Sequence, residues 1–255
     1  MTMTLTYYHA EPLANSLKSM LPLFEKGLEF ESVYVNLHKF EQHQPWFVAL
    51  NPDGQVPVLD HDGVVITQTS AINEYYEDAF PDLPPLRPNN PEGNARMRIW
   101  NKFVDEHVMN FVSIHGWHRM VGIIARNIES GEFEALLENI PLHEQREKWR
   151  TARSGFSQAD LDNATRKIEV ALARVEAQLG ETIWLAGGSY TLADINFYSH
   201  CGMMVDRMFP EMEVDLRFPR LADWRERVTA RPATQAAIAM PDHTAPGLRT
   251  WSGAR

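Results

Sequence analysis

The sequence lacks several features that mark particular classes of protein. It has a single cysteine, Cys201, so an internal disulfide is excluded and a reducing compartment is indicated. No apolar run reaches the roughly 18 residues that a membrane helix needs. The first residues, Met1 to Tyr8, lead into a strand pattern without a basic region or a cleavable apolar stretch. The net charge is −10 with no basic block to offset it, which argues against nucleic-acid binding. These absences predict a cytoplasmic protein without a membrane span.

The composition is that of an ordinary globular protein, with 44% hydrophobic and 23% charged residues in a chain of 255. Such a chain can form one large domain or two small ones. Up to residue 80 the sequence alternates between strand and helix patterns. The expected elements are strands at 5–9 and 30–35, a hairpin that pairs Val58-Leu59 with 64–66, and helices at 15–26 and 70–80. The order β-α-β, loop, β-β-α predicts a strand pair after a βαβ unit.

A proline-rich stretch separates this first part from the rest. Residues 81–91 contain five prolines in eleven residues, which favours an extended linker. Beyond it, apolar residues recur at helical spacing near 93–127, 131–139, 158–179, 191–207 and 218–230. We therefore expect an α/β domain at 1–82, a linker at 83–92 and an all-helical domain at 93–255. Thr191-Leu-Ala-Asp194 reads as a capping box, for which we expect a structural role and no catalytic one.

Pro57 stands where a short apolar strand, Val58-Leu59, begins after the turn Asn51-Pro-Asp-Gly54. Proline cannot donate a hydrogen bond to a β-ladder, so it is restricted to strand starts, edges and bulges. One interpretation is an ordinary strand start. The other is a cis Val56–Pro57 bond that leaves the Val56 N–H and C=O open to pair with an extended peptide. The flanking β-α-β and β-β-α order and the helical second half favour the cis bond.

With these features in place, the chain resembles the glutathione S-transferase superfamily over essentially its whole length. The Val56-Pro57 strand, the proline linker and the Thr191–Asp194 box carry the resemblance. It implies a thioredoxin-like first domain followed by an all-helical one, the glutathione transferase fold. It also implies that Gln55, Val56 and Pro57 bind glutathione through the backbone of its cysteine.

Three stretches are similar to one branch of the bacterial glutathione-dependent β-etherases of lignin breakdown. They are Ala14-Asn-Ser-Leu-Lys18, Lys39-Phe-Glu-Gln-His43 followed by Trp46-Phe47, and Pro141-Leu-His-Glu-Gln145 followed by Lys148-Trp-Arg-Thr-Ala-Arg153. We expect the last stretch, 141–153, to be an insertion-like loop. The resemblance implies that a glutathione thiolate attacks the β-carbon of a lignin-derived aryl ether ketone, giving a glutathione thioether and a phenol.

This reaction needs a group that stabilises the thiolate, because a free thiol with a pKa near 8.5 is only a few per cent ionised at neutral pH. Asn15 and Ser16 lie at the start of the first helix, where side-chain donors, free N–H groups and the helix dipole favour an anion. Either residue is a candidate catalytic donor, and either could instead be the helix N-cap. Of Tyr7 and Tyr8, we expect one in the core.

The resemblance assigns the two ends of glutathione to other segments. At the amino end the family usually has Glu-Ser, and this chain has Gln68-Thr69, which removes the charged partner. Lys39, Gln42 and His43 are candidates for the glycine carboxylate, or else a solvated loop. No metal-ligand spacing or phosphate loop is present in the sequence, so glutathione is the expected co-substrate and no metal is expected.

The second substrate needs an apolar, aromatic-lined cleft between the domains. His115, Trp117, His118 and Trp149 are candidates for it, although the two tryptophans could equally belong to the core or to a dimer interface. A homodimer and a heterodimer remain open. Two other functions also remain: a weakly glutathione-binding subunit of a heterodimeric β-etherase, and a general glutathione S-transferase with other substrates.

Overall fold

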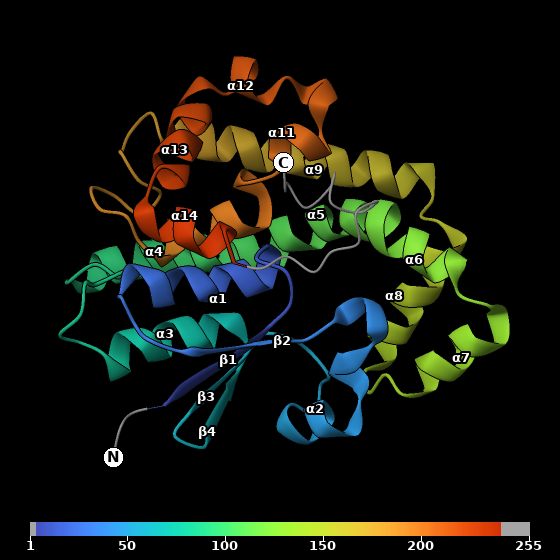
Figure 1. Cartoon of the computed structure of the whole chain (residues 1–255). Helices are drawn as coiled ribbons and strands as arrows, with labels where there is room; N and C mark the ends of the chain where they lie inside the picture. The colour runs from blue at the N-terminus through green and yellow to red at the C-terminus, as the bar shows by residue number, and fades with distance from the viewer. Residues whose placement is uncertain (1–3, 241–255) are drawn as a thin grey trace.

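A computed structural model of the chain describes residues 4–240, apart from the side chain of Arg207, and consists of a sheet-containing part and a helical part (Figure 1). The sheet-containing part comes first. Its strands are β1 (Leu5–His9), β2 (Glu31–Tyr34), β3 (Val58–His61) and β4 (Val64–Thr67). Its α-helices are α1 (Ala14–Glu25), α2 (Pro45–Leu50) and α3 (Thr69–Ala79). The predicted elements of this part are present, with ends that differ by one or two residues.

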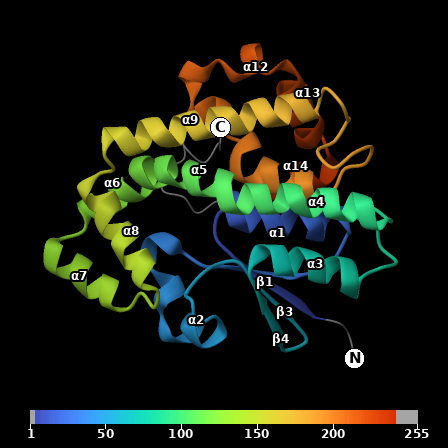
Figure 2. The same cartoon turned by 180° about the vertical axis from the view of Figure 1, so that it is seen from behind.

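The four strands form one mixed sheet in the order β2-β1-β3-β4. β1 and β2 are parallel, whereas β3 is antiparallel to both β1 and β4. Leu5, Tyr7 and Leu59 are buried on one face, which α1 and α3 cover (Figures 1 and 2). The predicted thioredoxin-like arrangement is therefore confirmed, and Tyr7 is the tyrosine in the core.

The segment between β2 and α2 is more ordered than the predicted polar loop. It contains two 3₁₀ turns, Leu37–Lys39 and Glu41–His43. Asn36 begins the first turn, because its side-chain oxygen accepts hydrogen bonds from the N–H groups of His38 and Lys39. α2 follows with Pro45 in its first turn and buries Phe47 against Val58 of the sheet. This chain path fixes the backbone that carries Gln42 and His43.

The helical part begins with α4 (Pro91–Phe103), and the N-cap Asn90 accepts from the Gly93 N–H. α4, α5 (Met109–Gly116) and α6 (Gly122–Asn127) continue one another through the π-helical turns Val104–Val108 and Trp117–Val121. The remaining α-helices are α7 (Ser130–Glu138), α8 (His143–Ser154), α9 (Gln158–Gln178), α10 (Leu192–Phe197), α11 (Val205–Met208), α12 (Val214–Arg217), α13 (Pro219–Thr229) and α14 (Pro232–Ile238). The predicted all-helical second part is confirmed. Residues 241–255 of the predicted domain lie outside the described residues.

The prediction of a loop at 141–153 is wrong, because these residues form most of α8. The segment His143–Ser154 consists mainly of good helix formers, and Arg150 pairs with Glu147 one turn earlier and with Glu134 of α7. Only Trp149 and Ala152 of α8 are buried, so the sequence of this segment shows little of the apolar periodicity that predicts a helix. α8 packs beside α6 and faces the turns between β2 and α2 (Figure 1).

Several polar contacts join the two parts and the segment between them. Residues 80–90 have neither helix nor strand, and the predicted linker 83–92 overlaps this stretch and the first turn of α4. Lys26 Nζ donates to the Pro84 carbonyl oxygen at 3.1 Å, and the Glu77 carboxylate accepts from the Leu86 N–H at 3.2 Å. Arg231, the residue before α14, forms a bidentate pair with Glu25 of α1 at 2.6 and 2.7 Å. The first part is thereby tied to the segment 80–90 and to the beginning of α14.

The predicted capping box at α10 is present. The Thr191 hydroxyl accepts from the Ala193 N–H, and the Asp194 carboxylate accepts from the Thr191 N–H at 3.0 Å. Asp194 also accepts from the Leu185 N–H and the Trp224 indole N–H. These bonds hold α10, α13 and the preceding turn together. Within residues 4–240, no helix combines the length and apolar character needed to cross a membrane.

Candidate active site

The first turn of α1 is the centre of the candidate site. Leu13, not Asn15 or Ser16, occupies the N-cap position, and no side chain caps the helix. The interpretation of Asn15 or Ser16 as the N-cap is therefore wrong. The first turn also carries no acidic residue. Free N–H groups and an uncompensated helix dipole make this end of α1 favourable for a negative charge.

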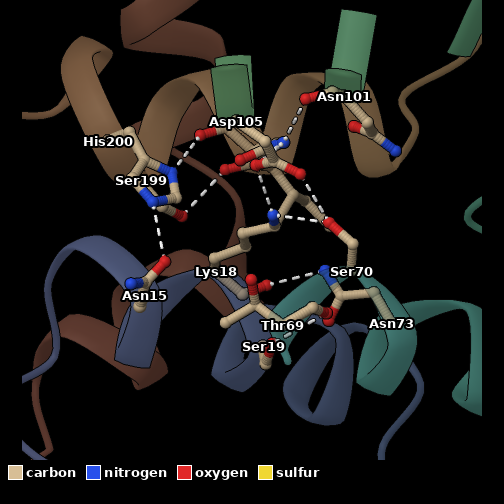
Figure 3. A network of polar contacts seen from close by, with 12 residues as sticks. Asn15, Lys18, Ser19, Thr69, Ser70, Asn73, Asn101, Asp105, Ser199 and His200 are labelled. Atoms are coloured by element: carbon tan, nitrogen blue, oxygen red, sulfur yellow. Dashed lines mark hydrogen bonds and ion pairs between the residues drawn. The ribbon is translucent and has the colours of Figure 1, made fainter. Parts of the chain in front are cut away.

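Asn15 contacts a histidine from the helical part of the molecule. Its Oδ1 lies 3.0 Å from His200 Nε2, as Figure 3 shows. The other ring nitrogen of His200, Nδ1, lies 3.0 Å from the Asn196 carbonyl oxygen. Burial, with a smaller contribution from the Lys18 charge, lowers the pKa of His200 to about 4. His200 is therefore neutral at pH 7 and has one ring proton for two acceptors.

The position of that proton decides which group Asn15 presents to a ligand. With the proton on Nε2, His200 donates to Asn15 Oδ1, and the Asn15 NH₂ group makes no hydrogen bond to a described residue. The amide then offers two N–H donors at the N-terminus of α1. With the proton on Nδ1, the favourable partner of Nε2 would be the NH₂ group instead. His200 thus controls the orientation of the Asn15 amide.

Ser16 has a different environment. It is buried, and its Oγ accepts from the Ala10 N–H at 3.1 Å. Its carbonyl oxygen accepts from the Tyr7 hydroxyl at 2.7 Å. These bonds join α1 to the end of β1 and to the following loop. Asn15 therefore has an available donor when the His200 proton is on Nε2, whereas Ser16 is engaged in holding the loop.

A buried polar network lies one turn further along α1 (Figure 3). Lys18 Nζ donates to Asp105 at 2.7 Å and to Ser70 Oγ at 2.9 Å. Asp105, in the π-helical turn 104–108, also accepts from Ser70 and from the Asn196 amide. Burial raises the pKa of Asp105, but Lys18 and the hydrogen bonds outweigh it and leave the pKa below its usual range. Burial, opposed by Asp105, lowers the pKa of Lys18. This network joins α1, α3, α10 and the turn 104–108 beside Asn15.

The Val56–Pro57 bond is cis, as predicted from the sequence. The β3 ladder begins at Val58, so the Val56 backbone lies outside the sheet register. The Asn51 amide donates to the Gln55 carbonyl oxygen at 2.7 Å and holds the preceding turn. The Val56 N–H and C=O therefore make no ladder hydrogen bond, and the backbone of another chain can pair with them.

Gln68 and Thr69 stand at the beginning of α3. Gln68 is exposed and has φ 70° and ψ 115°, a conformation that non-glycine residues seldom adopt. Such conformations persist where the surroundings enforce them and occur often at ligand-binding sites. The Thr69 carbonyl oxygen accepts from the Ser19 hydroxyl at 3.2 Å, which links α3 to α1.

Lys39, Gln42 and His43 occupy the two 3₁₀ turns. Lys39 is exposed, whereas Gln42 and His43 are buried. Among the described residues, Gln42 Oε1 and His43 Nδ1 have no hydrogen-bond partner although both atoms are inaccessible to solvent. Burial lowers the pKa of His43 to about 4, so the ring is neutral at pH 7. Gln42 and His43 are therefore held inside the turns, and Lys39 is the one of the three residues whose side chain is exposed.

Gly54 makes this arrangement possible. Its φ of +61° favours glycine, and a Cβ there would lie 2.6 Å from His43 Nδ1. The turn that precedes the cis proline therefore packs directly on His43. This contact brings the Gln55–Pro57 segment next to the turn that carries Gln42.

The four candidate residues for the second substrate fall into two groups. Trp117 and Trp149 contact each other at 5.4 Å between ring centroids, and Trp149 packs on Phe40 at 4.7 Å. Trp149 is buried and Trp117 partly buried. His115 instead faces α9, where its Nε2 lies 3.0 Å from Thr165 Oγ1, and His118 contacts Phe156. The structure brings the tryptophans together and places the histidines elsewhere on the helix.

Cys201 is buried, and burial raises the pKa of its thiol to about 12. A thiol with such a pKa is not nucleophilic at neutral pH, as expected from the apolar sequence around it. Within residues 4–240, no group of three or more His, Cys, Asp or Glu side chains is arranged to hold a metal ion.

His200 and Asp105 belong to the site or border it, and no feature of the sequence points to them. Lys18 and Lys148 stand in two of the stretches that carry the β-etherase resemblance, without a role assigned to either. A lysine beside Leu17, Met20 and Leu21 is a signal for a buried ion pair. No comparable signal marks His200, because its partner Asn15 lies 185 positions away in the sequence.

Comparison with known proteins places the chain among proteins of one family. Two family models match it: the N-terminal domain of glutathione S-transferase at residues 3–78 and the C-terminal domain at residues 140–232. Protein LigF of Sphingobium sp. (strain NBRC 103272 / SYK-6) is 45% identical over 235 residues, which cover 91% of each chain. The crystal structure of the beta-etherase LigF matches with a TM-score of 0.90 and 42% identity, covering 93% of this chain and 100% of LigF.

More distant relatives share the architecture. Glutathione S-transferase F13 of Arabidopsis thaliana is 28% identical over 244 residues, which cover 91% of this chain and 93% of the plant protein. The structure of glutathione S-transferase III in its apo form has a TM-score of 0.70 and 28% identity, covering 95% of this chain and 100% of that protein.

Proposed function

Since the chain belongs to the glutathione S-transferase family and is an enzyme of that type, we propose that it is a glutathione-dependent β-etherase. The substrates would be lignin-derived aromatic α-ketones with a β-aryl ether bond. The observation that carries the proposal is the similarity to the beta-etherase LigF along nearly the whole of both chains. The available Asn15 donor at the N-terminus of α1 supports it with a group that suits a thiolate.

In this proposal glutathione lies along the Gln55–Pro57 segment, with its cysteine backbone paired to Val56. Its sulfur lies at the N-terminus of α1, where the Asn15 NH₂ group donates to the thiolate. Each unit by which the thiol pKa falls corresponds to about 1.4 kcal/mol of thiolate stabilisation. Ser16 is the alternative donor, but its hydrogen bond with Ala10 makes Asn15 the better candidate.

The two ends of glutathione occupy the flanking turns. Lys39, Gln42 and His43 lie beside the glycine carboxylate, for which the Lys39 ammonium group and the Gln42 NH₂ group are suitable donors. The contact of Gly54 with His43 supports this assignment, because it brings these turns next to the Gln55–Pro57 segment. Gln68 and Thr69 hold the γ-glutamyl group at the start of α3. The unusual backbone conformation of Gln68 supports that role.

In the reaction, the thiolate sulfur forms a bond to the β-carbon while the β-carbon–oxygen bond breaks. The electron pair of that bond moves to the aryl oxygen, which leaves as a phenolate and takes up a proton. The products are a glutathione thioether and a phenol, and the ketone is unchanged. Trp117, in the π-helical turn 117–121 that follows α5, contacts Trp149 of α8, and an arene ring could pack against its indole there.

The test is incubation of the protein with glutathione and both enantiomers of a β-aryl ether ketone. Chiral chromatography of the remaining ketone, with quantification of phenol and thioether, shows cleavage and its stereochemistry. We expect equal amounts of phenol and thioether. Conjugation of a chlorodinitrobenzene without any ether cleavage would instead identify a transferase with other substrates.

Gln68 favours a second candidate, a subunit of a heterodimeric β-etherase. An uncharged side chain in place of the usual Glu forms a weaker hydrogen bond with the γ-glutamyl ammonium group. Calorimetric titration of the isolated chain with glutathione separates the two proposals. Binding together with turnover supports the independent enzyme, whereas absence of both, restored by a related subunit, supports the heterodimer.

The proposal includes the organisation of the chain. Residues 1–82 would form the glutathione-binding domain, 83–92 the linker and 93–255 the substrate-binding domain of a cytoplasmic dimer. Light scattering on the purified protein measures the oligomeric state, and a monomer with full activity would contradict the dimer.

A further inference from the structure

Lys148 of α8 has an unusual environment for a lysine. Its Nζ lies 3.2 Å from Ser113 Oγ and 4.8 Å from the ring centroid of Trp117, both on the neighbouring helical run. The Ser113 hydroxyl donates to the Asn110 carbonyl oxygen, so its oxygen is the acceptor for Lys148. The ammonium group has three N–H donors, and only one of them has a hydrogen-bond partner among the described residues.

The other lysines of the chain show that this environment is exceptional. The sequence contains six lysines, and all lie within the described residues. Lys18, Lys26 and Lys102 pair with Asp105, Glu77 and Glu106, respectively. Lys39 and Lys167 are exposed. Lys148 is partly buried and has no carboxylate within 4.0 Å in the described part of the chain.

An unpaired cation that is partly removed from water raises the free energy of the folded state. Burial lowers the pKa of Lys148, which makes its ammonium group a stronger acid than a solvated lysine. Proteins retain such lysines where they act on a ligand. An indole ring beside the free N–H groups favours a ligand that has an aromatic ring next to an oxygen that carries or gains negative charge.

α8 brings this group to the border of the proposed glutathione site. Trp149, the next residue, packs on Phe40, and Phe40 lies 6.1 Å from the His43 ring. Phe40 separates the two 3₁₀ turns that carry Lys39, Gln42 and His43. α8 therefore borders the turns that carry Lys39, Gln42 and His43, and Lys148 lies on the side of α8 that faces α5.

From this placement, and resting on the proposed function, we propose that Lys148 donates a proton to the aryl oxygen that leaves the β-carbon. As the sulfur–carbon bond forms and the carbon–oxygen bond breaks, the Nζ–H proton moves to the phenolate oxygen. The products are the thioether, a neutral phenol and a neutral Lys148 amine. Before the next turnover the Lys148 amine takes up a proton from water. This uptake balances the proton that glutathione released to water when its thiol ionised.

The experiment compares wild type with Lys148→Met on β-aryl ether ketones whose leaving phenols range from unsubstituted phenol to nitrophenol. Proton donation matters most for a poor leaving group and least for one that leaves easily as an anion. We expect kcat/KM of Lys148→Met to fall about 10²- to 10⁴-fold for phenol and only a few-fold for nitrophenol. The dependence of the rate on the leaving-group pKa should therefore become steeper.

Two further variants provide controls. Lys167→Met, which removes an exposed lysine of α9, should match wild type for every ketone. Lys148→Arg keeps the positive charge, but its guanidinium is too weak an acid to transfer a proton, so we expect it to stay at least 10-fold below wild type for the phenol ether. Thermal unfolding of each variant shows whether it is folded.

Other outcomes would overturn the role of Lys148. One such outcome is an equal loss of kcat/KM for all leaving groups, and another is full recovery of kcat/KM with Lys148→Arg. A third is a loss of glutathione affinity that accounts for the lower kcat/KM. The last result would assign Lys148 to the carboxylate of glutathione. Failure of the wild-type protein to cleave any of the ethers would overturn the proposed β-etherase function itself, and with it this role.

Discussion

Asn15 and Ser16 are neighbours in the first turn of α1, yet their side chains have different partners. Asn15 contacts His200 and has a free NH₂ group when the His200 proton is on Nε2, whereas Ser16 accepts from the buried Ala10 N–H. We expect Asn15→Ala to lower kcat by about 10²-fold, the usual loss when one donor to a developing anion is removed. The unfolding free energy should also fall, by about 1–3 kcal/mol, because the buried His200 Nε2 loses its hydrogen-bond partner. Steady-state kinetics with the β-aryl ether ketone and urea unfolding measure both.

Ser16→Ala is the matched variant and should lower stability without lowering turnover. Loss of the acceptor leaves the Ala10 N–H buried and unpaired, which costs about 1–3 kcal/mol of unfolding free energy. Turnover at saturating glutathione should stay near wild type. Retained turnover in Asn15→Ala with lost turnover in Ser16→Ala would transfer the thiolate role to Ser16.

His200 makes the stability of the protein depend on pH in a defined direction. Its pKa falls from 6.5 to about 4 on folding because the ring is buried. Between these values the unfolded chain binds a proton that the folded chain does not, so stability is fully present above pH 6.5 and is lost as the pH falls toward 4. The shift corresponds to about 3 kcal/mol. In His200→Phe this loss should be absent, as urea unfolding at a series of pH values would measure.

The comparison with wild type isolates His200 from three other groups whose pKa shifts affect stability in this range. Burial raises the pKa of Asp194 to about 6, so its contribution changes with pH in the opposite sense. Burial lowers the pKa of His43 to about 4 and also lowers that of His115, so their contributions have the same sense as that of His200. All three groups are present in wild type and in the variant, so their contributions cancel in the difference. An equal pH dependence in the two proteins would contradict the neutral state of His200.

At the scale of elements, the pair of Lys18 and Asp105 joins α1 to the π-helical turn 104–108. Lys18 is buried, and removal of its partner would leave a buried positive charge. We expect Asp105→Leu to reduce the unfolding free energy by about 3 kcal/mol. Combining it with Lys18→Met should restore part of that loss, because the unpaired charge is then absent. A double-mutant cycle by urea unfolding measures the coupling.

The pair of Lys102 and Glu106 is the control for this cycle. Both side chains are exposed and lie one turn apart on neighbouring helical segments. Lys102→Ala should change the unfolding free energy by about 0–1 kcal/mol. A coupling between Lys18 and Asp105 as small as this would show that the network does not depend on their charges.

At the scale of the whole molecule, one hydrophobic core runs through both parts. It includes Leu5 and Tyr7 of β1, Leu17 of α1 and Trp224 of α13. The ion pairs of Lys18 with Asp105 and of Arg231 with Glu25 cross between the same parts. α1 therefore lies between the sheet and the helices, with buried contacts on both sides (Figure 1).

This shared core predicts that the two parts unfold in a single cooperative transition. Urea unfolding followed by far-ultraviolet circular dichroism and by tryptophan fluorescence should give coincident curves. A fragment of residues 1–82 should not fold alone, because it would expose the face of α1 that packs on the helical part. Two separate transitions would show that the parts are independent.

The sequence by itself determined the features that depend on short-range chemistry. The strand and helix order, the capping box at Thr191 and Asp194, and the cis Val56–Pro57 bond follow from residues within a few positions of one another. Backbone propensity, side-chain caps and proline geometry act over that range, so they can be predicted from the chain. α8 belongs to the same class, because its composition favours a helix. It was missed because only two of its residues are buried and the apolar pattern was too weak.

Only the tertiary structure decided which of these residues meet. Asn15 and His200 are 185 positions apart, and Lys18 and Asp105 are 87 apart. The absence of a carboxylate near Lys148 in the described residues also depends on how α8 packs against α5. Hydrogen bonds, charge pairing and pKa values depend on neighbours in space, which the packing of distant segments determines. The sequence therefore identified the segments that form the candidate site. The fold showed that Asn15 and Ser16 have different hydrogen-bond partners and that Lys148 has no carboxylate partner among the described residues.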